Sequence, residues 1–446
     1  MSTIESRDET NPERRLALIG VGRLGLCLAL VAERAGYSVL GVDVLPQYVD
    51  AINGRSLKSN EPKVTDYLRA SKRLRATTQL EEAIDFSDHL MVLVATPSTG
   101  GARHYDVTQL SRVLMHINSK KPRNKIITIC CTVMPGYIAT IGRALLSDCE
   151  NVQLQYNPEF IQQGNIIEGL ERPDTVLIGE SSTYGGDLVE RLWRSFVRNP
   201  DQVSVHRMSP ESAEIAKLAL NCFITMKISF ANFIGDVADR TQNADKNAIL
   251  ASIGADSRVG PKCLLPGYGF GGPCFPRDNR AFGGYAESVG IDPMISHTTD
   301  AYNGRHAAYM AEALLAQNRP EYIFEGVTYK YPCAVPIIEE SQKLAVAAQI
   351  ARAGKRVIIR DRRDVIESCR MEWGLLFEYD IIDDKLGSEK HAPNGSYQDS
   401  MGRDSQEREP FTPPRSAGTG DVRHEAALSA LDPRHGSVMD SFGPSK

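Results

Sequence analysis

The chain has 446 residues, enough for about three domains at roughly 150 residues each, and its 42% apolar content is ample for packed cores. The formal net charge of −5 and the pI near 6.0 exclude the broad basic field that drives binding to nucleic acids or anionic membranes. The N-terminus is polar, and no run reaches the roughly 18 apolar residues that span a bilayer. We therefore expect a cytoplasmic protein that recognises any phosphate group locally.

The nine cysteines and nine histidines are scattered along the chain, without a CxxC pair or the ligand spacing of a metal site. In a reducing cytosol such thiols are usually buried apolar residues. The sequence therefore indicates no metal site and predicts that most of the cysteines are structural.

The N-terminal part of the chain alternates short apolar runs with helical stretches. LALIG (16–20) is a predicted strand, followed by a glycine turn, a helix and a second strand, YSVLGVD, at 37–43. Further apolar runs at 90–97 and 125–133 continue the alternation that a doubly wound parallel sheet requires. We expect a Rossmann-type α/β domain over residues 14–205.

The pattern changes at Ser209, where Ser-Pro-Glu combines an N-cap, a proline at the first helical position and an acid in the first turn. This predicts a helix of roughly 30 residues and a helical middle domain over 206–318. The α/β pattern then returns with two strands around one helix. We expect an incomplete second Rossmann-like unit over 319–384 with exposed apolar sheet surface, and a disordered tail, rich in Gly, Ser, Pro, Asp and Arg, over 385–446.

A dinucleotide fingerprint directly follows the first predicted strand. Its glycines permit a tight turn, close approach of the backbone to a pyrophosphate, and close packing of the following helix. Asp43 closes the next strand 18 residues after the last glycine, where a carboxylate accepts bonds from ribose hydroxyls and repels a 2′-phosphate. NAD is therefore favoured over NADP, with FAD left open by this motif alone. The predicted cofactor-binding turn comprises Gly20, Val21, Gly22, Leu24 and Gly25.

Four further segments resemble the UDP-glucose/GDP-mannose dehydrogenase family. They are NPEFIQQG (157–164), SAEIAKLALNCFITMKISFAN (212–232), PGYGFGGPCFPRD (266–278) and GVTYK (326–330). The third is the most specific, because a glycine-rich loop that presents Cys-Phe-Pro, a basic residue and Asp is rare outside this family. The resemblance covers roughly residues 15–345 and implies NAD-dependent oxidation of a nucleoside-diphosphate hexose to its uronic acid.

Cys274 is the predicted nucleophile of this reaction. Small residues beside it leave the thiol approachable, and a thiolate can attack an aldehyde to give a thiohemiacetal. A second hydride can leave from that adduct, and hydrolysis of the resulting thioester gives a carboxylate. One site would therefore oxidise an alcohol to an acid.

Other catalytic assignments come from the resemblance. Lys217 and Asn221 are spaced i, i+4, so they project from one helix face, and the matching family residues lie against the reacting carbon. A cation there stabilises an alkoxide or oxyanion, and an amide orients water or a hydroxyl. Asp278 matches the aspartate that works with the lysine, Glu159 the glutamate linked to water activation, and Thr132 the threonine of the family's Ser-Thr-Val segment.

The resemblance also implies binding residues. Besides Lys217 and Asn221, the sugar nucleotide would contact Phe160, Ile161, Arg258, Tyr268, Gly271, Tyr329 and Lys330. The cofactor would contact the loop of Thr96, Pro97 and Ser98, together with Cys131. In the family, the arginine matching Arg258 reaches the sugar nucleotide of a neighbouring subunit, which implies a homodimer or higher homo-oligomer built on the middle domain.

Several positions depart from the family pattern. Gln163 and Phe233 replace glutamates, Cys131 replaces a serine, and the acidic pair and arginine expected after Lys330 are absent. UDP-glucose is the leading candidate substrate. UDP-N-acetylmannosamine, UDP-N-acetylglucosamine and GDP-mannose remain alternatives, as does a non-catalytic paralogue that binds nucleotide sugars.

Overall fold

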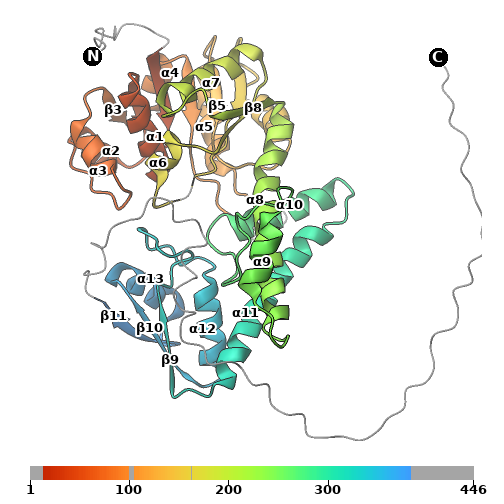
Figure 1. Cartoon of the computed structure of the whole chain (residues 1–446). Helices are drawn as coiled ribbons and strands as arrows, with labels where there is room; N and C mark the ends of the chain where they lie inside the picture. The colour runs from red at the N-terminus through yellow and green to blue at the C-terminus, as the bar shows by residue number, and fades with distance from the viewer. Residues whose placement is uncertain (1–13, 100–104, 162, 383–446) are drawn as a thin grey trace, which may run out of the picture. The chain divides into compact units, whose positions relative to one another are not determined.

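The structure is a computed structural model that describes residues 14–99, 105–161 and 163–382 (Figure 1). The tail that we predicted to be disordered, 385–446, lies outside the described residues.

An eight-stranded sheet occupies the N-terminal part of the chain, in the order β3-β2-β1-β4-β5-β6-β7-β8. Its strands are β1 Arg15–Ile19, β2 Ser38–Val42, β3 Leu74–Thr77, β4 His89–Val92, β5 Ile126–Ile129, β6 Gln153–Tyr156, β7 Thr175–Gly179 and β8 Ser204–Met208. The first six are parallel, as predicted, but β6 pairs antiparallel with β7, so β7 and β8 run in the opposite direction. Antiparallel neighbours need no long crossover, and only one six-residue helix connects β6 to β7.

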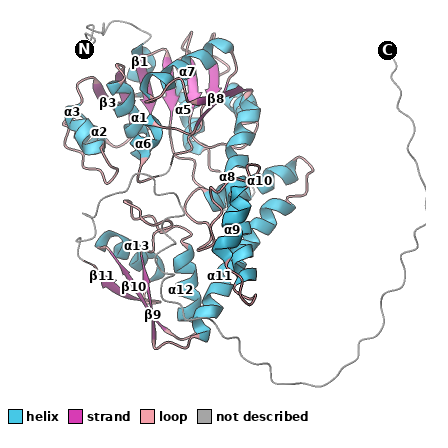
Figure 2. Ribbon diagram, viewed as in Figure 1, coloured by secondary structure: helices cyan, strands magenta, loops and turns pink. Residues whose placement is uncertain are grey.

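Helices cover both faces of this sheet (Figure 2). They are α1 Arg23–Arg34, α2 Pro46–Asn53, α3 Val64–Ala70, α4 Leu80–Phe86, α5 Thr108–Ser119, the π-helix η2 Ile138–Gly142, α6 Ile166–Glu171 and α7 Thr183–Phe196. Alternate residues of β1 enter opposite cores: Leu16 and Leu18 pack with α1 and α7, whereas Ala17 and Ile19 pack with α4 and α5. This alternation is the expected behaviour of a strand buried on both faces.

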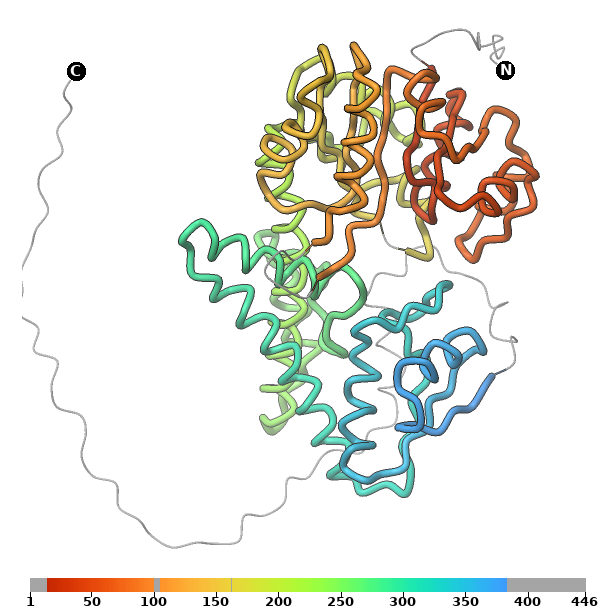
Figure 3. Tube along the Cα trace, turned by 180° about the vertical axis from the view of Figure 1, so that it is seen from behind, coloured from red at the N-terminus to blue at the C-terminus, as the bar shows by residue number. Residues whose placement is uncertain are grey.

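In the described part of the chain, four helices lie between the eight-stranded sheet and the C-terminal unit: α8 Pro210–Ala238, α9 Lys246–Ala255, α10 Phe275–Ser288 and α11 Met294–Ala316. The α8 helix has 29 residues, and the Ser209 hydroxyl accepts a bond from the backbone of Ser212, so the predicted N-cap and length are confirmed. The α8 helix packs along α10 and α11, as the reverse view also shows (Figure 3). This packing brings the two helices that carry most of the predicted catalytic residues into contact.

The C-terminal unit has one more strand than the sequence indicated. Its sheet has the order β11-β10-β9 and is parallel throughout. The elements are β9 Glu321–Glu325, α12 Gln342–Arg352, β10 Arg356–Asp361, α13 Arg363–Trp373 and β11 Glu378–Ile381. The inward-facing Phe324 and Ile359 pack with both helices in one core.

The outer face of this small sheet carries ion pairs, which differs from the apolar surface that we expected. Arg356 of the central strand binds Glu321 on one neighbour and a glutamate on the other, and Arg360 binds Glu325 at 3.1 Å and Asp380 at 2.7 Å. Opposite charges on adjacent strands stabilise a sheet face that meets water. The unit is therefore suited to solvent on this face.

Replacing isoleucine by alanine should lower the free energy of unfolding more on the inner face of the small sheet than on its outer face. Ile359→Ala empties a fully buried position and should lower the free energy of unfolding by about 2–5 kcal/mol. Ile323→Ala, at a position 43% exposed on the outer face, should cost less than about 1 kcal/mol. Urea unfolding followed by tryptophan fluorescence measures both. Equal losses would contradict the assignment of the faces.

Candidate functional site

The glycine turn after β1 has the steric features of a dinucleotide cradle. Gly20 has a φ of +94°, and a Cβ there would lie 2.7 Å from the carbonyl oxygen of Leu93. A Cβ on Gly25 would lie 2.0 Å from the Gly20 oxygen, whereas a Cβ on Gly22 would point into open space. The first and third glycines are therefore required by packing, and the second leaves the backbone approachable. Val21 is buried and Leu24 half-buried beside the turn.

The other predicted cofactor residues follow neighbouring strands of the same sheet. Asp43 comes directly after β2, half-buried, and its Oδ1 accepts a bond from the Leu45 backbone at 3.2 Å. The Thr96 hydroxyl, after β4, donates to the carbonyl of Thr132, after β5, at 2.8 Å. Ligands of parallel α/β sheets bind at this carboxyl edge of the strands. These residues therefore fit a dinucleotide.

Cys131 is a poor candidate for polar contact with a cofactor through its thiol. It is buried, and desolvation raises its pKa to about 12. Pro97 and Ser98, which directly follow Thr96, are exposed.

Cys274 is the N-cap of α10, and Asp278 lies in the first turn of that helix. On α8, Lys217 and Asn221 are both buried, and Asn221 Nδ2 donates to Asp278 Oδ2 at 2.7 Å. The structure thus brings together four predicted catalytic residues from two helices that are far apart in the sequence.

The surroundings of Cys274 shift the pKa of its thiol in opposite directions. Its side chain is accessible to solvent, yet the protein atoms packed around it raise the pKa of the thiol, against the positive charges of Arg277 and Lys217. Its position at a helix N-terminus favours the thiolate. The net rise in pKa means that the nucleophile needs a nearby group to take its proton.

Lys217 connects the helix pair to the NPEF loop. Its ammonium donates to the carbonyl of Glu159 and lies 4.5 Å from the centroid of the Phe160 ring. Burial lowers the pKa of Lys217, while the charges of Asp278 and Cys274 oppose that shift. An ammonium in this position can lose a proton more readily than an exposed lysine, and can stabilise a developing oxyanion when charged.

Glu159 is a second titratable group at this site. Its Oε1 is buried and has no hydrogen-bond partner among the described residues. Burial raises the pKa of its carboxyl to about 7, with the charge of Lys217 opposing the rise. A carboxyl with this pKa can exchange a proton with water near neutral pH, as general base catalysis requires.

Contacts at both ends hold the NPEF loop in place. At its start, Asn157 donates to the backbone of Leu177 at 2.8 Å and accepts from the Trp193 indole at 2.7 Å. Near its end, the buried Glu61 accepts from the Gly164 backbone at 2.7 Å. A third contact joins Gln163 to the guanidinium of Arg23, the first residue of α1, and so links this loop to the glycine turn.

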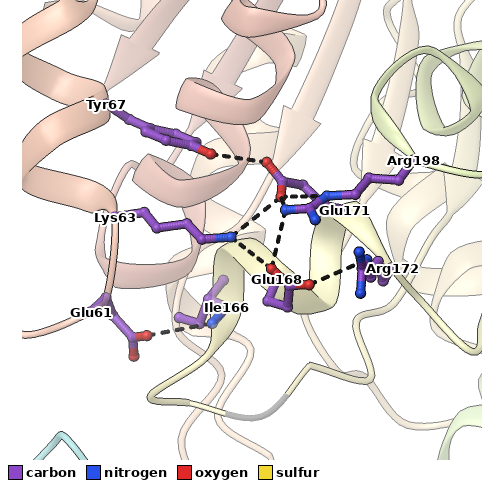
Figure 4. A network of polar contacts seen from close by, with 8 residues as sticks. All are labelled: Glu61, Lys63, Tyr67, Ile166, Glu168, Glu171, Arg172 and Arg198. Carbon is purple, nitrogen blue, oxygen red and sulfur yellow. Dashed lines mark hydrogen bonds and ion pairs between the residues drawn. The ribbon is translucent and has the colours of Figure 1, made fainter. Parts of the chain in front are cut away.

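An ionic network continues from this loop into α6 (Figure 4). Glu168 binds Lys63 of the segment before α3 at 2.6 Å, and Glu171 binds Arg198 at 2.5 Å. Glu171 also accepts from the Tyr67 hydroxyl at 3.2 Å. The network fixes the helix that follows the loop, so Glu159 and Phe160 project from a segment supported on both sides.

The glycine-rich loop before Cys274 is held by residues that the sequence patterns did not identify. Asn232 accepts from the Gly267 backbone at 2.8 Å, and the Asn303 side chain binds both backbone groups of Phe270. His306 lies between the Gly267 carbonyl, at 2.6 Å, and Asp236 of α8, at 2.8 Å. Asn232 ends the family-like segment 212–232 but was not assigned a role, and the signal for Asn303 and His306 is their i, i+3 spacing on α11, which is common in helices.

A pocket forms where this loop meets the segment after β9. A Cβ on Gly271 would lie 2.3 Å from the Glu340 oxygen, and one on Gly272 would lie 2.4 Å from the Tyr329 ring, so both glycines are required for the contact. Three predicted substrate residues line this pocket: Tyr268, Tyr329 and Lys330. The other residues that line it are Gly269, Gly326, Thr328, Tyr331, Ser341, Gln342 and Lys343.

Two predicted substrate residues have other surroundings. The Arg258 side chain is 86% exposed and binds Asp256 at 2.7 Å. Ile161 packs toward α6, where it would meet a Cβ on Gly169 at 3.0 Å. Among the described residues, no group of three or more His, Cys, Asp or Glu side chains could hold a metal ion.

Two family models match the chain. The NAD binding domain of the UDP-glucose/GDP-mannose dehydrogenase family matches residues 14–197, and the central domain of the same family matches residues 211–305. UDP-glucose 6-dehydrogenase of Pseudomonas aeruginosa is 28% identical over 361 residues, covering 78% of this chain and 78% of its own. GDP-mannose 6-dehydrogenase of Pseudomonas putida is 26% identical over 360 residues, covering 78% of this chain and 80% of its own.

Solved structures agree with these matches. A UDP-glucose dehydrogenase from the archaeon Pyrobaculum islandicum has a TM-score of 0.75 and 25% identity, covering 84% of this chain and 87% of its own. The UDP-D-ManNAc dehydrogenase of Pyrococcus horikoshii, at 24% identity and a TM-score of 0.67, shares the fold, with 78% of this chain and 83% of its own covered. The chain belongs to the UDP-glucose/GDP-mannose dehydrogenase family, and its cofactor is NAD.

Proposed function

We propose that the protein oxidises the primary alcohol of a nucleoside-diphosphate hexose to the acid in two steps at one site, with UDP-glucose as the leading substrate. The observation that carries this proposal is the convergence on Cys274 of an ammonium, a carboxylate and an amide from two packed helices, beside a buried carboxyl with a pKa of about 7. Each group suits one step of a cysteine-dependent oxidation.

When bound, NAD accepts a hydride in each of the two oxidations. The glycine turn and Asp43 would hold its pyrophosphate and adenosine ribose, and the loop at Thr96 would lie along it. The protein's own groups must then move the protons and stabilise the charges that develop on the sugar.

Lys217 and Asn221 act on the sugar oxygen in the first oxidation. Burial makes the ammonium readily deprotonated, so Lys217 takes the hydroxyl proton and then stabilises the oxygen as charge develops. The Cys274 thiol, whose pKa is raised, transfers its proton to the same polar cluster as it adds to the aldehyde. The aldehyde stays attached as a thiohemiacetal, and its second oxidation leaves a thioester on Cys274.

Glu159 activates water for hydrolysis of this thioester. Its unpartnered Oε1 can accept a proton from water, and its pKa of about 7 leaves a large ionised fraction at neutral pH. Hydrolysis releases the acid and restores the Cys274 thiol.

The pocket at Tyr268 and Lys330 would hold the nucleotide part of the substrate. Lys330 and Lys343 supply cations that suit a diphosphate, and three tyrosines supply ring faces. UDP-N-acetylmannosamine, UDP-N-acetylglucosamine and GDP-mannose contain the same diphosphate and are the alternative substrates. A non-catalytic binding role is the alternative outside this chemistry.

The protein should form a homodimer through α8. Apolar side chains recur on the solvent side of this helix: Leu220, Phe223, Phe230, Phe233 and Val237. By length and composition α8 could also cross a membrane, but half of its most apolar stretch is buried inside the protein. Lys227 binds the carbonyls of Val259 and Gly260 and so holds the Arg258 loop beside this face, which suits a contact with the partner's site.

Mixing the protein with UDP-glucose and NAD tests the reaction directly. We expect two NADH per sugar, because the aldehyde is retained on Cys274 between the oxidations. Cys274→Ala should abolish turnover with NAD affinity unchanged, whereas Cys149→Ala, at a partly buried thiol bonded to Asn118, should keep it. Absence of NADH with all four sugar nucleotides, while binding persists, would favour the non-catalytic role. One NADH per sugar would contradict the thioester route.

The pKa of Glu159 predicts the pH dependence of hydrolysis. The ionised form is the base, so hydrolysis should accelerate as the pH rises through about 7. Glu159→Gln should remove this dependence and slow hydrolysis by roughly 10²–10⁴-fold. A sugar adduct on Cys274 should then accumulate, visible by mass spectrometry of the intact protein. Glu214→Gln is the control, since burial also raises the pKa of Glu214 to about 7, but this carboxylate binds the backbone of Gly136 and Ile138. An unchanged pH profile in Glu159→Gln would exclude this base.

A charged substitution on the apolar face of α8 should lower the molecular mass of the protein particle in solution. Phe230→Asp places a charge in the centre of the apolar face and should convert the dimer to a monomer in light scattering after size exclusion. Met371→Asp, at a position 83% exposed on α13, should leave the dimer intact. A monomeric wild-type protein would disprove the dimer without affecting the assignment of the reaction.

A further inference from the structure

We infer that Tyr105 is a positioning residue that couples the cofactor loop to the catalytic carboxylate of Asp278. The inference rests on the proposed dehydrogenase function and extends it to a residue outside every motif that carried the family resemblance. Its basis is a buried hydroxyl 173 residues away from its partner in the sequence.

The Asp278 carboxylate is fully buried and is surrounded by donors. Tyr105 Oη donates to Oδ1 at 2.9 Å, Arg277 Nε donates to the same oxygen at 2.8 Å, and Asn221 Nδ2 donates to Oδ2 at 2.7 Å. Lys217 adds its charge nearby. A buried carboxylate remains charged at acceptable cost when donors and cations of this kind surround it. The Tyr105 hydroxyl is the only one of the three donors that comes from outside α8 and α10.

The Tyr105 ring is buried and packed against both helices. It is 3% exposed and packs with Leu218 of α8 and Ala281 of α10. The Arg277 guanidinium lies 5.0 Å from the ring centroid. The ring therefore contacts both catalytic helices, at positions one residue from Lys217 on α8 and three residues from Asp278 on α10.

The backbone of Tyr105 is joined to the predicted cofactor loop. Tyr105 and Ser98 form an antiparallel bridge, and the next residue, Asp106, donates its N–H to the Pro97 carbonyl at 2.8 Å. Pro97 and Ser98 follow β4, where NAD would lie. The position of this loop is therefore transmitted through one rigid side chain to the carboxylate that orders Asn221 and influences Lys217.

Tyr105→Phe tests this coupling, because it removes only the hydroxyl and keeps the ring in its packing site. We expect kcat to fall by about tenfold or more, as for loss of one hydrogen bond to a buried charge, with KM for both substrates within about twofold of wild type. In single-turnover measurements the rate of the first hydride transfer should fall by a similar factor, because a displaced carboxylate slows the chemical step and leaves binding unchanged.

Tyr137→Phe is the matched control. Tyr137 is also buried in the sheet core, and among the described residues its hydroxyl pairs with Ser111, at 3.4 Å. Its kcat and its single-turnover rate should match the wild type. Wild-type kcat in Tyr105→Phe, a change in KM without a change in kcat, or equal losses in both variants would overturn the inference. If the wild-type protein itself forms no NADH, the proposed function fails instead, so the two failures are distinguishable.

Discussion

The buried carboxylate of Asp278 is the point on which the geometry of the site depends. An isolated charge in such a place would be costly, so the surrounding chain must supply hydrogen bonds to it. It obtains them from Tyr105, Arg277 and Asn221, which belong to a sheet loop, α10 and α8. Satisfying this one group therefore fixes the distance between the helices and the depth at which the sheet loop enters. Cys274 and Lys217 inherit their positions from that arrangement.

The buried carboxyl of Glu159 has a different environment from that of Asp278. Burial raises its pKa to about 7, and its Oε1 has no partner among the described residues, whereas three donors surround Asp278. Environments that differ in this way suit two carboxyls to different roles. Asp278 is suited to a fixed charge that organises its neighbours. Glu159 is suited to proton exchange, and contacts of Glu61 and of α6 hold its loop in place.

Sequence patterns predicted the features that depend on local order. The glycine turn and the capped α8 helix follow from residues adjacent in the chain, and the family resemblance rested on the loop around Cys274. Tyr105, Asn303 and His306 could not be found in this way, because each acts on a partner more than 30 residues away and has an ordinary residue type for a core. The reversal of β7 and β8 was missed for a similar reason. A buried strand has the same apolar pattern in either direction.

The expectation of an apolar outer sheet face in the C-terminal unit came from comparing its length with that of a complete Rossmann unit. Alternation along β9 and β10 places Phe324 and Ile359 inward and charged residues outward, the pattern of a sheet that needs cover on one face only. Such a unit can present its ligand-binding groups from the segment between β9 and α12, independently of a second helical layer. Lys330 lies within that segment, and Lys343 lies in the first turn of α12, which Ser341 caps. Under the proposed function, these cations favour the diphosphate that all four candidate substrates contain. Selectivity among the sugars must then arise where the hexose meets Lys217 and Asn221, next to the reacting carbon.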